Sequence, residues 1–494
     1  MTIGTALWVA AVLLGAALRL GGLDLLPLGD DEARLALAAL RMARGEAGGG
    51  EDPLAEALTA LVFFLAGDSD PATRLSSALF GTALVALPWF WRRELGEGAM
   101  LLASSLLAVS PTLVHSSRLA ASDQMVVVLA LLAARAATRV DVEPGQRVLL
   151  GALTGLLILA GTPGWAALLL MGTAVVLSLR ARPDWLRRGL ESCLQPAVWL
   201  TALAVYWVLG GVLTGSFTPR LDGVSRWVAL WEWPERGESP LAALALVLAH
   251  EPLVLGLSLV AGLPVARSGT APPGPWPRFL GLWALAGSLL WLGTAGSERG
   301  LFSLVVVPGL LYLAPRGVEA GQGAVLRWRR LSRERDLSGL RLVSMLPPLA
   351  GAAALLVLLA VQTHTLSALN FAPDSPELWP AERTDVGARR TLDELVQDLR
   401  RPPKGAAGLA EGLGSPVAWY LRRATAPAPP LPVAALVGGS APSGATAYAK
   451  IGIAQRQVWQ SDSFDLALAW RWLVRRTAPG PRHGVDVPVY LVER

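Results

Sequence analysis

The sequence predicts a polytopic α-helical membrane protein with a smaller, more polar α/β part at its C-terminal end. Of the 494 residues, 53% are hydrophobic and only 16% are charged, and the mean hydropathy is +0.46. An ordinary soluble domain carries about 25% charged residues, because its surface must be hydrated. The apolar residues also gather in runs long enough to cross a bilayer. These observations place most of the chain in a membrane.

About eleven runs are predicted to span the membrane, allowing for tilt and short loops. The segment 54–66 is too short to cross, and we expect an interfacial or re-entrant helix there. No Lys or Arg precedes the first run and no convincing small-residue cleavage site follows it, which favours a retained span over a cleaved signal peptide. The predicted spans lie near 5–22, 73–91, 99–116, 119–137, 147–161, 164–179, 195–214, 241–263, 279–294, 300–315 and 343–363.

Arg residues in the loops predict the orientation of the spans. Positive residues in short loops mark the cytoplasmic side, so we expect a cytoplasmic N-terminus in the cell (plasma) membrane. Arg19, at the far end of the first span, is an exception. Residues 23–72 then form a first outer loop, which is acidic. The Arg clusters that define the cytoplasmic side lie at 92–93, 135–147, 180–188, 267–278 and 327–335.

Two parts of the chain are predicted. Residues 1–363 form the transmembrane domain, and an odd number of spans places residues 364–494 outside as a small extracytoplasmic α/β domain. Its pattern changes to that of a soluble protein, with amphipathic helices and short strands separated by the proline-rich APAPPLP. The predicted helices lie near 385–400 and 415–423, and the predicted strands are PVAALVGG and VPVYLVE.

The sequence does not support several kinds of site or partner. The single Cys193 cannot form an intramolecular disulfide, and no Cys/His cluster has the spacing of a zinc site. The net charge is +5, but the Arg residues lie between apolar segments rather than on one basic face, so no nucleic acid is expected. No soluble cofactor is implied. A divalent cation is not indicated, although Asp30, Asp31 and Asp52 can supply oxygen ligands.

The stretch GDDEARLALAALRMARGE places three consecutive acids, Asp30, Asp31 and Glu32, where the first span meets the outer face. One interpretation is a capped interfacial helix, with an Asp as N-cap, acids that favour the positive helix end, and Arg34 four residues after Asp30. The other is a carboxylate at the mouth of a cavity, acting as general base on an acceptor hydroxyl. The spacing alone leaves the two interpretations comparable.

The order of several motifs resembles the GT-C superfamily of membrane glycosyltransferases, of the protein O-mannosyltransferase and aminoarabinose-transferase type. More closely it resembles the prokaryotic branch described as flippase-activity-associated proteins. The resemblance runs across most of the chain and is strongest over 28–140. It implies transfer of a sugar from a lipid-linked phosphate donor at the outer face, by an inverting displacement. The motifs are DEA after the first span, GDSDPATRLSSALFG, RRELG, LLAVSPTLVHSSRLAASDQMVV, HEPLVLGLSLVAGL, SERGLFSLVVVPGLLYLA, SPVAWYLRR and LAWRWLVRR.

The resemblance also implies roles for particular residues. Asp31 with Glu32 matches the acidic pair, with Asp31 as general base. Arg118, in HSSR, matches a position that can hold a phosphate, although an interfacial anchor is an equal alternative. Asp123 follows in the next span, where an acid needs a partner such as Arg118. The adjacent Glu298 and Arg299 match a Glu-Lys pair that can reach a lipid phosphate, and a plain loop ion pair is at least as well supported.

The sequence also departs from the family pattern. Family members tend to show an aromatic Asp-Pro and then a His-Gly-Pro segment, whereas GGGEDPLAEAL keeps Asp52 and Pro53 but lacks the aromatics and the His. A Lys-Glu after the fifth span is replaced by GTPGW, and the aromatic cluster before HEPL is replaced by PLAALALVLA. Several groups that would bind a sugar or position an acceptor are therefore absent.

We therefore predict a membrane glycosyltransferase of the cell envelope with a GT-C-like fold, which moves a sugar from a polyprenyl-phosphate-linked donor to an unidentified acceptor. The alternative is a catalytically degenerate relative that binds lipid-linked glycan or assists a flippase or assembly complex. A transporter ranks last, because it needs polar residues along a mid-membrane path and the spans are mostly Leu, Ala, Val and Gly.

Overall fold

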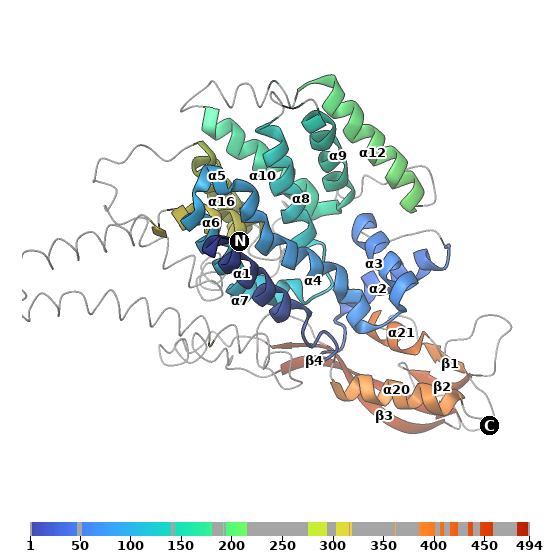
Figure 1. Ribbon diagram of the computed structural model, residues 1–494. Coiled ribbons are helices and arrows are strands. Elements are labelled where there is room, and N and C mark those ends of the chain that lie inside the picture. The colour runs from blue at the N-terminus through green and yellow to red at the C-terminus, as the bar shows by residue number, and fades with distance from the viewer. Residues whose placement is uncertain are drawn as a thin grey trace, which may run out of the picture. The chain divides into compact units, whose positions relative to one another are not determined.

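A computed structural model of the chain forms two compact units. The first combines Met1–Gly21, Ala47–Ala57 and Leu75–Ser367, and the second combines Gly22–Glu46, Leu58–Arg74 and Ala368–Arg494. The second unit therefore joins most of residues 23–72, the region predicted to be the first outer loop, to the C-terminal part of the sequence. The structure describes residues 2–46, 52–139, 143, 145–179, 191, 194–214, 275–293, 303–315, 317–318, 361, 384, 386–400, 406–409, 415–422, 433–437, 445–457 and 482–492 (Figure 1).

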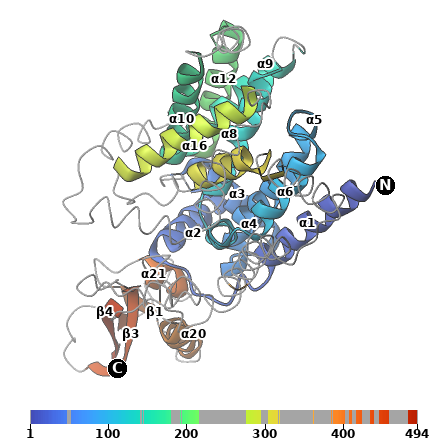
Figure 2. The same ribbon diagram turned by 90° about the vertical axis from the view of Figure 1, so that its left-hand side faces the viewer.

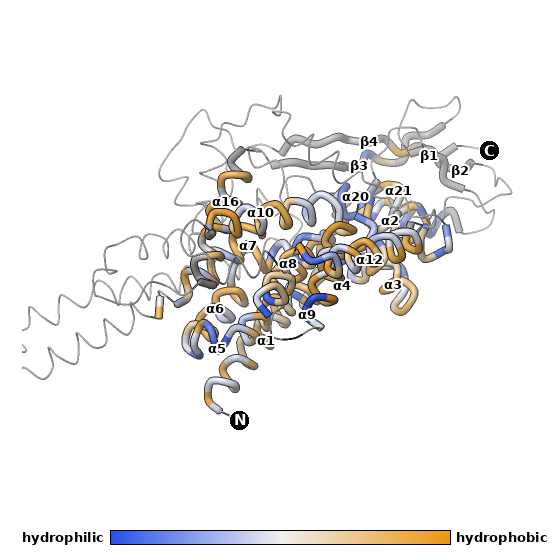
Figure 3. Tube along the Cα trace, turned by 90° about the horizontal axis from the view of Figure 1, so that it is seen from above, coloured by the Kyte–Doolittle hydropathy of each residue, from blue (hydrophilic) through white to orange (hydrophobic). Residues whose placement is uncertain are grey.

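The first unit is helical throughout the residues that the structure describes. Two helices, α3 (Pro53–Ala66) and α4 (Asp70–Ala86), run from one unit into the other. Helices such as α10 and α16 are largely hydrophobic along their length (Figure 3), which suits contact with lipid. The remaining elements are α1 (Ile3–Leu20), η1 (Leu87–Trp91), α5 (Arg92–Leu95), α6 (Glu97–Val109), α7 (Pro111–Ser117), α8 (Asp123–Ala137), α9 (Gly145–Leu159), α10 (Gly161–Leu179), α12 (Pro196–Thr214), α16 (Pro275–Gly293) and a helix at Ser303–Pro315.

The predicted count of eleven spans is not established. Among the described residues, α1 and α12 are long and apolar enough to cross a membrane, and the bent pair α6 and α7 qualifies if it forms one span. Other predicted spans correspond to shorter apolar helices, including α9 and Ser303–Pro315. The predicted spans near 241–263 and 343–363 lie outside the described residues. The segment expected to be interfacial or re-entrant forms α3, a helix of 14 residues.

A proline and a buried arginine lie at the bend between α6 and α7. The two helices meet at 59° across Ser110, because Pro111 has no N–H to donate to the carbonyl of Leu107. The Arg19 guanidinium donates instead to the carbonyl oxygens of Leu107 at 2.7 Å and Ala108 at 3.1 Å. Arg19, an exception to the loop pattern, is thus a fully buried donor for a broken helix. Gly81 makes room, since a Cβ there would lie 2.4 Å from that of Ser117.

The second unit contains a four-stranded sheet. The strand order is β1-β2-β4-β3, with β1 parallel to β2 and both other pairings antiparallel. Helix α20 packs against β3 and α21 (Figure 2). The elements are α2 (Asp30–Ala43), α20 (Val386–Arg400), β1 (Ala406–Leu409), α21 (Ser415–Leu421), β2 (Val433–Val437), β3 (Ala445–Gln457) and β4 (Arg482–Val492).

One hydrophobic core holds the second unit together. It draws on the first outer loop, where Leu28 and Phe63 are buried, and on the C-terminal part, where Leu392, Trp419 and Val489 are buried. The rings of Phe63 and Trp419 stack with centroids 5.7 Å apart. Segments more than 300 residues apart in the sequence therefore share a core, and burial of their apolar side chains stabilises both.

Candidate active site

The three consecutive acids of the first outer loop begin α2 and have three different environments. The predicted Asp N-cap is wrong, because Gly29 is the N-cap and Asp30 is the first helical residue. The free N–H of Gly29 instead donates to Oε2 of Glu32 at 3.0 Å. A carboxylate three residues into a helix can reach back to the N-cap in this way. Glu32 therefore stabilises the start of α2.

Glu32 is also one half of a buried ion pair. Arg74, from the start of α4, binds both of its carboxylate oxygens, with Nε 2.8 Å from Oε1 and Nη2 2.7 Å from Oε2. The other guanidinium N–H groups donate to the carbonyl oxygens of Leu23, Leu26 and Pro27 at 2.7–3.1 Å. All five donors of the arginine are used. Arg74 thus fixes the turn that leads into α2.

Asp30 and Asp31 point to different partners. The Asp30 carboxylate accepts from the backbone N–H of Ser415, the first residue of α21, at 2.8 Å. Asp31 forms an ion pair with Arg34, three residues further along α2. The side chain of Asp31 is 76% exposed. Of the three acids, Asp31 is the most exposed to solvent in this unit.

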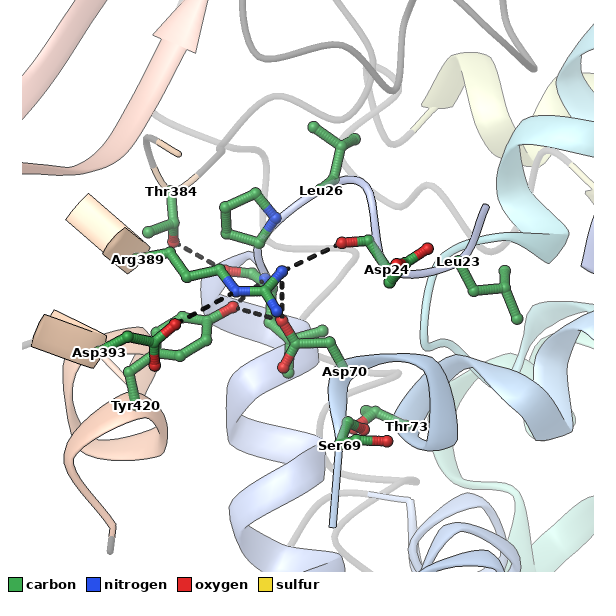
Figure 4. A network of polar contacts seen from close by, with 12 residues as sticks. Leu23, Asp24, Leu26, Ser69, Asp70, Thr73, Thr384, Arg389, Asp393 and Tyr420 are labelled. Carbon is green, nitrogen blue, oxygen red and sulfur yellow. Dashed lines mark hydrogen bonds and ion pairs between the residues drawn. The ribbon is translucent and has the colours of Figure 1, made fainter. Parts of the chain in front are cut away.

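A second polar network surrounds Asp70, from the motif GDSDPATR (Figure 4). Its carboxylate accepts from Nε1 of Trp419 at 2.9 Å and from the hydroxyl of Tyr420 at 2.8 Å. Arg389 of α20 lies 3.3 Å from the same carboxylate. Burial, reinforced by the negative charge of Asp70, raises the pKa of Tyr420 well above its usual range. Tyr420 therefore stays protonated and can donate to Asp70.

A third polar contact, between Arg422 and Asp68, joins the C-terminal part of the chain to the first outer loop. Arg422 donates to a carboxylate oxygen of Asp68 at 2.7 Å and to its carbonyl at 2.8 Å. Its guanidinium also lies 3.6 Å from the centre of the Trp419 ring, a cation–π arrangement. The C-terminal motif SPVAWYLRR is thus bound to Asp68 and Asp70 through Trp419, Tyr420 and Arg422.

The other predicted site residues lie in the first unit or outside the described residues. Asp52 accepts a hydrogen bond at 3.0 Å from the hydroxyl of Ser122, which immediately precedes Asp123, the first residue of α8. Arg118 follows α7, is buried, and donates to the carbonyl of Leu18 at 3.3 Å. The first unit thus brings Asp52 to the turn that carries Arg118 and Asp123. The pair Glu298 and Arg299 lies outside the described residues.

Within the described ranges, no group of three or more His, Cys, Asp or Glu side chains is arranged to hold a metal ion. Of the oxygen donors considered for a cation, Asp30 and Asp31 belong to the second unit and Asp52 to the first. Sequence reasoning missed Arg74, Asp70 and Tyr420, whose partners lie far away in the chain. The available signal was their place in two quoted motifs, GDSDPATR and SPVAWYLRR.

The fold is similar to that of two proteins of known structure, ArnT and AglB. The chain is similar to ArnT from Cupriavidus metallidurans bound to undecaprenyl phosphate, with 17% identity, a TM-score of 0.60 and coverage of 85% of each chain. The apo state of ArnT gives 18% identity and a TM-score of 0.59, and the alignment covers 88% of this chain and 92% of ArnT.

A more distant likeness is to the archaeal oligosaccharyltransferase AglB from Archaeoglobus fulgidus, in complex with an inhibitory peptide and a dolichol-phosphate. It has 13% identity and a TM-score of 0.52, and the alignment covers 85% of this chain but 64% of AglB. No protein-family model matches the sequence, and no curated protein sequence matches it. The structural likeness confirms the GT-C resemblance that the motifs indicated.

Proposed function

We propose that the protein transfers a sugar from a polyprenyl-phosphate-linked donor to an acceptor at the extracytoplasmic face of the membrane. The observation that carries the proposal is the GT-C fold with an exposed carboxylate, Asp31, at the position that the family motif assigns to the general base. One ArnT structure holds undecaprenyl phosphate, and the AglB structure holds a dolichol-phosphate. Both ligands are lipid phosphates of the donor class proposed here.

In the proposed reaction, Asp31 takes the proton of an acceptor hydroxyl while the acceptor oxygen attacks the anomeric carbon of the sugar. The bond from that carbon to the phosphate oxygen breaks, its electron pair leaves with the polyprenyl phosphate, and the anomeric configuration inverts. Arg118 is assigned to the lipid phosphate, because a guanidinium can bind it through two hydrogen bonds. Asp52 and Asp123, with Glu298 and Arg299 from the resemblance, are assigned to substrate binding.

The experiment is a turnover assay on the purified full-length protein with a panel of radiolabelled undecaprenyl-phosphate sugars and cell-envelope extract as acceptor source. Label should leave the lipid phase with wild-type protein, and D31N should lower that rate by about 10²-fold or more. The matched control is D24N, which removes another exposed carboxylate from the same loop. Equal rates in D31N and wild type would refute the role of Asp31.

A degenerate relative that binds lipid-linked glycan without turnover is the second candidate. Two observations favour it, namely the missing aromatic and His positions after α2 and the ion pair that engages Asp31 with Arg34. This candidate predicts that the wild type is inert across the donor panel, and that D31N leaves binding of undecaprenyl phosphate and any function in cells unchanged.

For the topology, we propose a cytoplasmic N-terminus and an extracytoplasmic domain over residues 364–494, supported by the loop arginines. The chain offers a direct test, because Cys193 lies in a loop predicted to be cytoplasmic. A membrane-impermeant maleimide should leave Cys193 unlabelled in intact cells. In a C193S background, R390C should be labelled, since Arg390 is 82% exposed. The reverse pattern would overturn the orientation.

A further inference from the structure

Leu28, two residues before α2, is held by side chains from the C-terminal part of the chain. Its N–H donates to the hydroxyl oxygen of Tyr420 at 2.8 Å, and its carbonyl accepts from the hydroxyl of Thr384 at 2.7 Å. The Leu28 side chain is fully buried. Buried backbone groups that lose their partners cost free energy, so both contacts define where this residue sits.

The Tyr420 hydroxyl connects two parts of the first outer loop through two hydrogen bonds. It accepts from the N–H of Leu28 and donates to Asp70 (Figure 4). Asp70 also accepts from Nε1 of Trp419, the residue before Tyr420. Asp70 is only 5% exposed, and a buried carboxylate needs such donors to remain charged. The hydroxyl therefore uses both its donor and its acceptor capacity.

A hydrogen bond at Asp30 also fixes the start of α2 to the C-terminal part of the chain. Asp30, the first residue of α2, accepts from the N–H of Ser415. Leu28 and Asp30 are thus both fixed from the C-terminal part, and Arg74 fixes Glu32. Asp31 lies between these anchored residues and shares their backbone. The backbone on both sides of Asp31 is therefore held by these contacts, while its own carboxylate pairs with Arg34.

We propose that Tyr420 and Asp70 are positioning residues for the transfer reaction, which hold Leu28 and so set the direction of Asp31 towards the acceptor. The proposal rests on the proposed function. A general base has to lie within hydrogen-bond reach of the proton that it takes. A misplacement of about 1 Å can lower a rate by about 100-fold. Loss of the hydroxyl should therefore affect the chemical step more than donor binding.

The test compares Y420F with wild-type full-length protein, using the undecaprenyl-phosphate sugar that supports turnover in the panel. We expect kcat to fall by about 10- to 100-fold, with the KM for that donor changed less than about threefold. The milder variant T384V removes one hydrogen-bond donor to Leu28 and should also lower kcat. It keeps the proposal testable if Y420F does not fold. The control is R390Q, on the same unit and exposed, which should leave kcat unchanged.

Amide hydrogen exchange of residues 23–34 gives a readout that does not depend on turnover. Exchange at Leu28 and at the start of α2 should rise in Y420F and T384V, and should stay at the wild-type rate in R390Q and D31N. An unchanged kcat in Y420F and T384V, or unchanged exchange, would overturn the proposal. An inert wild type would refute the proposed function and the positioning role together, while the exchange data would still decide whether Tyr420 holds Leu28.

Discussion

Replacing Arg74 by methionine tests whether the start of α2 depends on one buried guanidinium. The substitution R74M removes five hydrogen bonds and leaves the Glu32 carboxylate and three carbonyl oxygens without their donor. Breaking a buried pair by removal of one partner costs about 3–5 kcal/mol. In a domain of about 150–250 residues, each kcal/mol shifts Tm by roughly 2–4 °C. The expected loss is therefore roughly 6–20 °C.

The matched control is R34M, on the neighbouring ion pair of the same helix. Arg34 and Asp31 are 49% and 76% exposed, and exposed pairs contribute about 0–1 kcal/mol. The assay is thermal unfolding of the detergent-purified protein, with hydrogen exchange of residues 23–34 to locate the loss. Equal Tm values for R74M and R34M, or exchange that rises elsewhere and not in this loop, would refute the reasoning.

Three further predictions concern other parts of the chain. R19M should destabilise the first unit by about 1–3 kcal/mol for each carbonyl left without a donor at Leu107 and Ala108, and P111A should recover part of that loss in thermal unfolding, because it restores an N–H for Leu107. Since the pKa of Tyr420 is raised by folding, the unfolded chain releases this proton first, near pH 10, so stability should fall as pH rises above that value. Y420F should reduce the stability lost between pH 9 and 11 by about 1.4 kcal/mol in total, and an unchanged loss would contradict the assignment. G81V should disrupt packing around Ser117 and lower expression of folded protein, since even a Cβ at this position is too close; normal yield on size-exclusion chromatography would contradict it.

The sequence allowed the class of fold and several local elements to be predicted. Apolar runs and their spacing indicated helices at the positions of α1 and α12, and amphipathic spacing indicated α20 at Val386–Arg400. The strands predicted from PVAALVGG and VPVYLVE correspond to β2 and β4. Each of these signals lies within a short window of sequence, so local periodicity suffices. The motif LAWRWLVRR lies outside the described residues.

The elements that were missed depend on distant partners. Strand β3 carries alternation only weakly, in AYAKIGIAQ, and β1 is four residues long, so neither pattern rises above its surroundings. The role of Glu32 as partner of Arg74 could not be predicted, because the two residues are 42 positions apart. Likewise no local pattern joins Asp30 to Ser415 across 385 positions. Spacing within one helix placed Arg34 four residues after Asp30, but it could not indicate the contact with Ser415.

The second unit is built from three segments of the chain, and these segments are synthesised at different times. Asp70 is made 350 residues before Tyr420, and at about 5–20 residues per second translation of that interval takes roughly 20–70 s. During this period α2 and Asp70 have left the ribosome, but Trp419 and Tyr420, which contact Asp70, have not yet been synthesised. Non-local pairings of this kind form late. Premature termination anywhere before Tyr420 would therefore leave the outer loop open, even with every preceding residue in place.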